Sequence, residues 1–271
     1  MGPWQCAFDV QDSVALVLDL PANKVRVQQA QAGGAFGSRS DENENGLSAL
    51  TALTASITGK PAAILMTREE STVSHAKRHA FFMKYKTGAK RDGTLVAEEI
   101  EIVSDTGAYL SWGINVLKRA IVHSTGPYVI PNVKADAYCV YTNNPYASAF
   151  RGFGCPQVHF AAESQMNCLA ESLSMDPISL RMKNLLHPNS TTSTGQVLGE
   201  SVGLEKCLAT VADRLRLSEA PPQKGHKRGL GIAAGYHGNS LGPEGADRCG
   251  AMITVRPDGH VEYMIGLSEY G

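Results

Sequence analysis

The sequence lacks the patterns that accompany a membrane anchor or a metal held by protein side chains. No apolar run approaches the roughly 18 residues that a transmembrane helix needs. The six cysteines are far apart and form neither a CxxC pair nor the four-cysteine spacing of an iron–sulfur cluster. The eight histidines include no HExxH motif. Because the N-terminus also lacks a signal-peptide layout, we expect reduced thiols and a cytoplasmic location.

Charge is scarce as well. Only 19% of the residues are charged, and the 25 basic and 26 acidic side chains leave a net charge of −1. A long-range basic surface for nucleic acid or for an acidic membrane is therefore excluded. With 43% apolar residues, a chain of 271 residues is globular and long enough for one large domain or two of ordinary size. We expect a small-molecule substrate and no nucleic-acid partner.

The spacing of apolar and turn-forming residues predicts an α+β fold. Helices are expected over residues 8–20, 43–58, 157–173, 177–186 and 204–215. Single strands are expected over 24–30 and 62–66, and the run of glycines over 229–235 also reads as a strand. Asp-Gly turns predict antiparallel hairpins over 80–104 and 249–267. Helices interleaved with antiparallel hairpins favour α+β over a doubly wound parallel sheet.

Two segments rich in glycine and phenylalanine carry the functional signal. The first, residues 33–39, reads Gly-Gly-Ala-Phe-Gly-Ser-Arg, and the second, residues 149–157, reads Ala-Phe-Arg-Gly-Phe-Gly-Cys-Pro-Gln. Glycines let backbone N–H groups approach a ligand closely, because no Cβ intervenes. Phenylalanine and arginine side chains can enclose a flat ring or pair with an anion. The pair of segments predicts a large, polar, partly planar cofactor held by backbone and arginine.

Other interpretations are open at these segments and at one later glycine-rich segment. A nicotinamide-binding fold is poorly supported, because neither GxGxxG nor a parallel βαβ unit is present. Cys155 is either a metal-facing thiol or a small apolar filler, and the filler is favoured. The glycine-rich segment 235–247 is either a loop that borders the cofactor or a plain surface loop.

The two segments together resemble the molybdenum-cofactor-binding subunit of the xanthine dehydrogenase and aldehyde oxidoreductase family, the molybdenum hydroxylases. That family usually has Gly-Gly-x-Phe-Gly-x-Lys and Ala-Phe-Arg-Gly-Phe-Gly-x-Pro-Gln. The second motif is nearly complete here, whereas Arg39 replaces the lysine of the first. The resemblance continues through residues 105–109, 130–132 and 181–184. It implies that family's cofactor-binding fold, with mixed and antiparallel sheets and packed helices.

The resemblance also assigns roles to residues of this chain. Cofactor contacts are implied for Gly34, Phe36, Gly37, Arg151 and Gly152. Substrate-pocket positions are implied for Arg119, Phe153 and Ser40. Arg119 is expected to pair with a substrate oxygen or carboxylate, and Phe153 to stack on a substrate ring. Ser40 stands where purine-oxidising relatives have a glutamate, which puts purine specificity in doubt.

The implied cofactor is molybdopterin in its dinucleotide form, with molybdenum held by the pterin sulfurs, so no protein metal ligand is expected. The implied reaction is hydroxylation of an aldehyde or N-heteroaromatic carbon, with water as the oxygen source. The general-base glutamate matches no residue of this chain and is expected downstream, so no catalytic residue is expected here. Two [2Fe-2S] clusters and FAD are expected on other domains or subunits, within an oligomer that also holds the remainder of the molybdenum subunit.

The resemblance further implies an internal fragment with three parts. A first cofactor-binding domain is expected over residues 1–189, a helix with linkers over 190–228, and the start of a second cofactor-binding domain over 229–271. Residues 268–271 resemble the beginning of a family segment that continues to Gly-Gln-Gly. The isolated chain is therefore expected to be catalytically inactive. The alternative is a non-catalytic homologue that serves as a scaffold or binding module.

Overall fold

The computed structural model describes residues 1–40, 42–217, 225–227, 229–239 and 249–265. The helices are α1 (Ala7–Leu18), α2 (Glu42–Thr58), α3 (Arg68–Ser74), α4 (Gly113–Val122), α5 (Cys155–Leu173), α6 (Pro177–Asn184) and α7 (Leu204–Leu217). The strands are β1 (Ala80–Ala89), β2 (Leu95–Gly107), β3 (Asn132–Tyr141), β4 (Ala251–Val255) and β5 (Val261–Ile265). Short 3-10 turns lie at Ala22–Lys24 and Ser38–Ser40. None of the helices in these ranges is long and apolar enough to cross a membrane.

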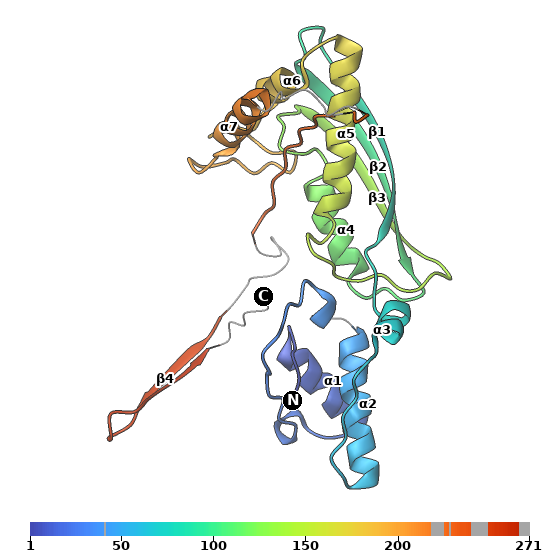
Figure 1. Cartoon of the computed structure of the whole chain (residues 1–271), viewed down its shortest axis with the longest axis vertical. Coiled ribbons are helices and arrows are strands. Elements are labelled where there is room, and N and C mark those ends of the chain that lie inside the picture. The colour runs from blue at the N-terminus through green and yellow to red at the C-terminus, as the bar shows by residue number, and fades with distance from the viewer. Residues whose placement is uncertain (41, 218–224, 228, 240–248, 266–271) are drawn as a thin grey trace.

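A mixed sheet with the strand order β1-β2-β3 lies along one side of the upper part of the molecule, covered on its inner face by helices α4 and α5 (Figure 1). β1 and β2 are antiparallel, whereas β2 and β3 run parallel, so the sheet is mixed as an α+β fold requires. Alternate residues of β2 face helices α4 and α5, and Ile100 and Ile102 are buried there against Leu117 and Val158. This packing fixes α4, which carries much of the candidate site.

A second apolar cluster joins the start of β2 to α5, α6 and α7 through Leu95, Met166, Leu180 and Leu208. Beside this cluster, the fully buried Arg181 donates from Nε to Glu163 Oε2 over 2.8 Å. The Tyr128 hydroxyl donates to the other oxygen of Glu163. The Ala234 N–H donates to Glu163 Oε2 over 2.8 Å. Glu163 therefore ties residues 229–239, here called the strap, to helix α5.

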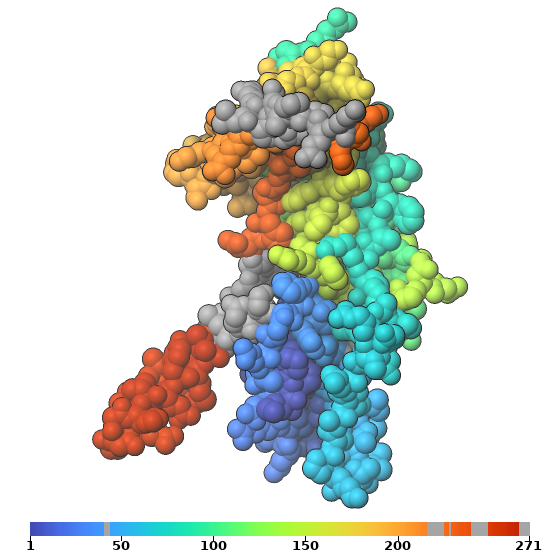
Figure 2. Space-filling view, in the orientation of Figure 1, coloured from blue at the N-terminus to red at the C-terminus, as the bar shows by residue number. Residues whose placement is uncertain are grey.

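The N-terminal helices α1 and α2 pack against each other apart from the sheet, in the blue part of Figures 1 and 2. The β4–β5 hairpin projects separately from the rest of the molecule, and every residue of both strands is exposed (Figure 2). An isolated pair of strands buries little apolar surface, so this hairpin adds little to the core.

Most predicted elements are confirmed, including α2, α5, α6, α7 and both hairpins. Three predicted strands are wrong. Residues 24–30 form the end of a 3-10 turn followed by extended chain, with a single bridge from Gln29 to Gly2. Residues 62–66 pair with no strand in the described ranges, and Leu65 is 94% exposed. In the strap, Ala234 bonds to a side chain instead of a strand.

Three elements were not foreseen as part of the fold. Helix α3 begins with a capping box, in which Thr67 accepts from the Glu70 N–H and the Glu70 carboxylate accepts from the Thr67 N–H. Strand β3 is the third strand of the sheet, and helix α4 packs on one face of this sheet. The parallel pairing of β3 with β2 brings both strands beneath the same helices.

Candidate functional site

The two glycine–phenylalanine segments, here called loop 1 (residues 33–40) and loop 2 (residues 149–154), touch each other. Gly37 has a φ of +100°, and a Cβ at this position would lie 2.5 Å from the Ala149 carbonyl oxygen. Only glycine fits such a close backbone approach without pushing the loops apart. The Gly37 N–H donates to Gln5 Oε1 over 3.1 Å, and this bond ties the turn to the N-terminal segment. The segments predicted to share a site therefore do lie together.

Cation–ring contacts reinforce this junction. The Arg151 guanidinium carbon of loop 2 lies 5.0 Å from the centre of the Phe36 ring of loop 1. Arg78, which precedes β1, covers the Phe150 ring at 4.5 Å and donates from Nη2 to the Arg151 carbonyl over 2.7 Å. Phe36 is 49% exposed, so this ring and the Arg151 guanidinium form an accessible aromatic and cationic surface.

Left-handed backbone shapes loop 2 where it enters helix α5. Gly152, Phe153 and Gly154 have φ values of +90°, +50° and +98°. A Cβ on Gly152 would lie 2.5 Å from Cγ of Pro156, and one on Gly154 would lie 2.4 Å from the Val116 carbonyl. Gly154 therefore lets the loop lie against helix α4, and Gly152 lets it turn closely over Pro156 of helix α5. Phe153 accepts a strained conformation of the kind that clusters at functional sites.

Trp112 links loop 1 to loop 2 at the start of helix α4. Its Nε1–H donates to the Ser40 carbonyl over 3.0 Å, and its ring meets the Phe153 ring edge-on at 6.1 Å. Ser40 itself is buried, and its hydroxyl donates to the Gly37 carbonyl over 2.9 Å. The Ser40 side chain thus closes the loop 1 turn, and its assignment to the substrate pocket stays a prediction.

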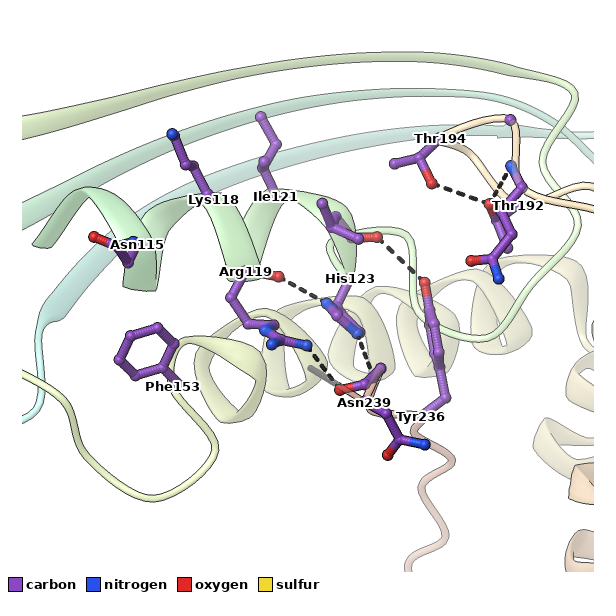
Figure 3. A pocket seen from close by; sticks show the side chains of 14 residues that line it. Asn115, Lys118, Arg119, Ile121, His123, Phe153, Thr192, Thr194, Tyr236 and Asn239 are labelled. Atoms are coloured by element: carbon purple, nitrogen blue, oxygen red, sulfur yellow. Dashed lines mark hydrogen bonds between the residues drawn. The ribbon is translucent and has the colours of Figure 1, made fainter. Parts of the chain in front are cut away.

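A cavity of about 740 Å³ opens beside loop 2 (Figure 3). Helix α4 lines it with Asn115, Lys118, Arg119 and His123, and loop 2 adds Phe153. The remaining wall comes from the turn at residues 192–196 and from residues 236–239 of the strap. Its volume lies within the range of small-molecule sites. Arg119 and Phe153, both assigned to the substrate pocket from the sequence, therefore line one cavity.

Arg119 and His123, which lie one helical turn apart at the end of helix α4 (Figure 3), bond to the carbonyl and to the N–H of Gly238. Arg119 Nη1 donates to the Gly238 carbonyl over 2.7 Å. The Gly238 N–H donates to His123 Nε2 over 2.9 Å, and His123 Nδ1 donates to the Arg119 carbonyl over 2.7 Å. These partners require a neutral imidazole with its proton on Nδ1. Burial, the largest cause, lowers the pKa of His123 to about 4, which keeps it neutral near pH 7.

Burial raises the pKa of two further side chains near the cavity. The Tyr236 hydroxyl donates to the Val122 carbonyl over 3.2 Å, and burial raises the pKa of this phenol to about 12. Cys155 is buried at the start of α5, and burial raises the pKa of its thiol to about 11. Cys155 is therefore a neutral thiol in the core, as the filler interpretation has it. In the described ranges, no group of three or more His, Cys, Asp or Glu residues is arranged to hold a metal ion.

The sequence interpretation missed His123 as part of the site, and it named Tyr236 only within segment 235–247, which it left open as a loop that borders the cofactor or a plain surface loop. The available signal was the spacing of Arg119 and His123, which are four residues apart and therefore share one face of a helix. Of the glycine-rich segment 235–247, residues 235–239 border the cavity, whereas 240–247 lie outside the described residues. Residues 268–271 lie outside them too.

Comparison with known proteins matches residues 2–185 to the family model "Molybdopterin cofactor-binding domain". Over 201 residues the chain is 48% identical to the large molybdopterin subunit of nicotinate dehydrogenase from Eubacterium barkeri, covering 74% of this chain and 47% of that protein. It is 35% identical to a probable xanthine dehydrogenase subunit from Bacillus subtilis, covering 95% of this chain and 34% of that protein.

Among solved structures, the aldehyde oxidoreductase from Desulfovibrio gigas superposes with a TM-score of 0.77 at 29% identity. That match covers 93% of this chain and 28% of the larger chain. The chain thus spans about half or less of the length of the relatives that it matches.

Proposed function

The chain belongs to the xanthine dehydrogenase and aldehyde oxidoreductase family of molybdenum hydroxylases, as part of the molybdopterin-binding subunit, and on this premise we propose that it forms one wall of the cofactor site and the substrate cavity of an enzyme that hydroxylates a planar N-heteroaromatic carboxylate. The observation that carries the proposal is that Arg119 and Phe153 line one cavity beside the junction of loops 1 and 2.

The residues at the loop junction fit a planar, anionic cofactor. A Cβ at Gly37 would collide with Ala149, so the bare backbones of the two loops meet where a large ligand can approach them. The Arg151 guanidinium beside the Phe36 ring offers a cation and an aromatic face together. Gly34, Phe36, Gly37, Arg151 and Gly152 would hold the molybdopterin, in its dinucleotide form. When bound, this group supplies the redox centre for hydroxylation with water as the oxygen source.

The chain's own residues bind and orient the substrate. Phe153 presents a ring edge or face to a planar substrate, a contact that contributes about 0.5–1.5 kcal/mol beyond area burial. Arg119 pairs with the substrate carboxylate, and the neighbouring Lys118 adds a second positive charge to the same cavity wall. Both cations select an anionic substrate over a neutral one. An aldehyde without a carboxylate would use Phe153 but not this charge.

Two observations support the heteroaromatic carboxylate over a purine or a simple aldehyde. The 48% identity to a nicotinate dehydrogenase subunit exceeds the 35% identity to a xanthine dehydrogenase subunit. Ser40 occupies the position of the purine-binding glutamate, and its short hydroxyl is turned back to Gly37. Nicotinate, a pyridine ring with one carboxylate, is therefore the substrate we propose.

The rest of the proposed enzyme lies outside this chain. We assign the general-base glutamate to the remainder of the molybdenum subunit, and the [2Fe-2S] clusters and FAD to other domains or subunits of a cytoplasmic oligomer. Within this chain we propose a first cofactor-binding domain over 1–189, a linking part over 190–228 and the start of a second over 229–271. A chain of this extent would bind substrate and cofactor only in part, so we expect no turnover from it alone.

Elemental analysis and turnover on the complete, cofactor-loaded protein test the proposal. We expect molybdenum in stoichiometric amount and hydroxylation of nicotinate with a higher kcat/KM than of benzaldehyde or xanthine. Stoichiometric molybdenum with a preference for benzaldehyde or xanthine would overturn the substrate assignment. A well-folded complete protein that holds no molybdenum would support the scaffold alternative instead, and turnover by the isolated 271-residue chain would refute the proposed division of the site.

A further inference from the structure

The Gly238 peptide is the point at which the strap meets the substrate cavity. Its carbonyl accepts from Arg119 Nη1 and its N–H donates to His123 Nε2, so both polar groups of the glycine bond to side chains of helix α4. A Cβ here would lie 3.4 Å from Arg119 Nη1 and 3.5 Å from His123 Nε2, which shows how closely both side chains approach the peptide. The Gly238 peptide is therefore in direct contact with the Arg119 guanidinium and with the His123 imidazole.

His123 is fixed more firmly than either of its partners. It is only 2% exposed, and its Nδ1–H is held by the Arg119 carbonyl one helical turn earlier. The strap is anchored elsewhere by Ala234 to Glu163 and by Tyr236 to Val122. In the described part of the strap after Tyr236, Gly238 is bonded to Arg119 and to His123 of helix α4.

We propose that His123 is a positioning residue: by fixing the Gly238 peptide, it sets the direction of the Arg119 guanidinium toward a substrate carboxylate. This inference rests on the proposed function, because Arg119 is assigned there to the substrate. It requires the neutral imidazole, since a protonated Nε2 would donate a hydrogen bond and could not accept one from Gly238.

Most of the groups that face His123 favour this neutral form, although its hydrogen bond to the Arg119 carbonyl raises the pKa of His123. Arg119 lies on the same helix, His159 faces it from α5 at 6.3 Å, and Tyr236 and His237 face it from the strap at 4.8 and 5.6 Å. The Glu163 carboxylate is bonded to Arg181, Tyr128 and Ala234 and faces His159. The surroundings of His123 are thus aromatic or cationic, which opposes its protonation.

Three variants of the complete, cofactor-loaded enzyme test the role. His123→Asn keeps a donor near Nδ1 but removes the acceptor for Gly238, whereas His123→Gln places a carbonyl oxygen near Nε2. We expect His123→Asn to raise KM for nicotinate about tenfold with kcat changed less than about threefold, as the loss of an oriented charge-assisted bond predicts. His123→Gln should recover most of this loss. KM for nicotinamide, which has no carboxylate, should stay constant.

His237→Asn is the matched control, because it removes a neighbouring imidazole that stacks on His123 but does not line the cavity. We expect its KM for nicotinate to match the wild type. Equal KM values in His123→Asn and the wild type would overturn the inference. Equal losses of nicotinate and nicotinamide turnover in a variant whose thermal unfolding is unchanged would also overturn it. Such a pattern would show that the substitution impairs the site independently of the substrate carboxylate.

A spectroscopic measurement on the complete protein separates this inference from the proposed function. With ¹⁵N-labelled histidine and arginine, His123 should appear as the neutral Nδ1–H tautomer at neutral pH. The Arg119 guanidinium signals should shift in His123→Asn and stay in place in His237→Asn. An Nε2–H tautomer, or Arg119 signals unaffected by His123→Asn, would refute the positioning role. A wild-type enzyme that ignores nicotinate would refute the substrate assignment alone, and the Arg119 signals would still decide the role of His123.

Discussion

The guanidinium of Arg151 lies 5.0 Å from the centre of the Phe36 ring, although the two residues come from loops far apart in the sequence. Gly37 and Ala149 meet beside this contact, and Trp112 joins Ser40 of loop 1 to Phe153 of loop 2. The interpretation of the two segments as one cofactor wall requires such convergence. Loops on opposite sides of the molecule could not have served one ligand.

Because Gly37 lies so close to Ala149, we expect alanine substitutions at two glycines of loop 1 to have different effects on stability and molybdenum content. In Gly37→Ala the new Cβ meets the Ala149 carbonyl at 2.5 Å and the residue must keep a φ of +100°, so we expect a loss of about 1–3 kcal/mol in unfolding free energy. We also expect loss of molybdenum from the complete protein. Urea denaturation and elemental analysis measure the two effects.

Gly33→Ala is the matched control for Gly37→Ala. A Cβ at Gly33 meets nothing within 4 Å, so we expect unchanged molybdenum content and stability at least equal to the wild type. If both variants keep their molybdenum, the loop junction is not part of the cofactor wall.

Two variants of Arg119 should separate the contribution of its charge to substrate recognition from that of its geometry. Arg119→Lys keeps the positive charge but loses the planar fork that matches a carboxylate, and Arg119→Met loses both. We expect KM for nicotinate to rise about tenfold in the lysine variant and about a hundredfold in the methionine variant, which corresponds to about 1.4 and 2.8 kcal/mol. Steady-state kinetics of the complete enzyme measure this order. A wild-type KM in Arg119→Lys would show that the fork has no role, and equal KM values in the two variants would show that the charge alone has none.

The buried Arg181–Glu163 pair should contribute strongly to the attachment of the strap. Glu163→Gln would leave the fully buried Arg181 cation without its counter-charge, and breaking such a pair costs about 3–5 kcal/mol. Urea denaturation measures this loss. Glu101→Gln is the control, because Glu101 pairs with Lys84 on the exposed face of the sheet and should give no measurable change. Equal losses in the two variants would contradict the anchoring role of Glu163.

Local signals in the sequence were sufficient to predict several elements of the fold. The Asp92-Gly93 turn between alternating strands predicted the β1–β2 hairpin. Asp176 before Pro177 predicted the start of α6, and its carboxylate does accept from the Ser179 N–H over 2.7 Å. These signals act within a few residues of the chain, so no knowledge of the tertiary structure was needed.

Elements that depend on distant partners could not be predicted in this way. β3 pairs in parallel with β2 across the whole of helix α4, and no turn signal reports such a pairing. The strap resembles a strand in sequence, but Glu163 takes the Ala234 N–H that a neighbouring strand would use. For the site, motif resemblance selected Arg119 and Phe153, which line one cavity, and their substrate roles stay predictions. The link from His123 through Gly238 exists only once the strap has folded over α4.

Glu98 should give the protein a pH-dependent stability that can be removed by one substitution. Its side chain lies on the buried face of β2, where Oε1 accepts from the Thr87 hydroxyl over 2.8 Å and Oε2 has no hydrogen-bond partner in the described part of the chain. Burial raises the pKa of this carboxyl from 4.5 to about 7, although the Thr87 bond opposes the shift. The folded state therefore binds a proton more tightly than the unfolded state between these pH values.

The sign of the effect follows from this difference. The contribution of Glu98 to stability is complete below pH 4.5 and is lost as the pH rises through about 7. His79 acts in the opposite direction: burial lowers its pKa from 6.5 to about 4, so its contribution is present above 6.5 and is lost as the pH falls toward 4. The two groups can be separated because only Glu98 penalises the folded state near pH 8.

Glu98→Gln keeps an acceptor for Thr87 and removes the buried charge. We expect it to exceed the wild type in unfolding free energy by on the order of 2–3 kcal/mol near pH 8 and to match it near pH 4, where the wild-type carboxyl is protonated. Urea denaturation at both pH values measures the gain. Glu99→Gln, on the exposed face beside Lys134, should show no such pH-dependent gain. If Glu98→Gln equals the wild type near pH 8, the Glu98 carboxylate is solvated and its pKa is not raised, because a buried charge could not be removed without raising stability.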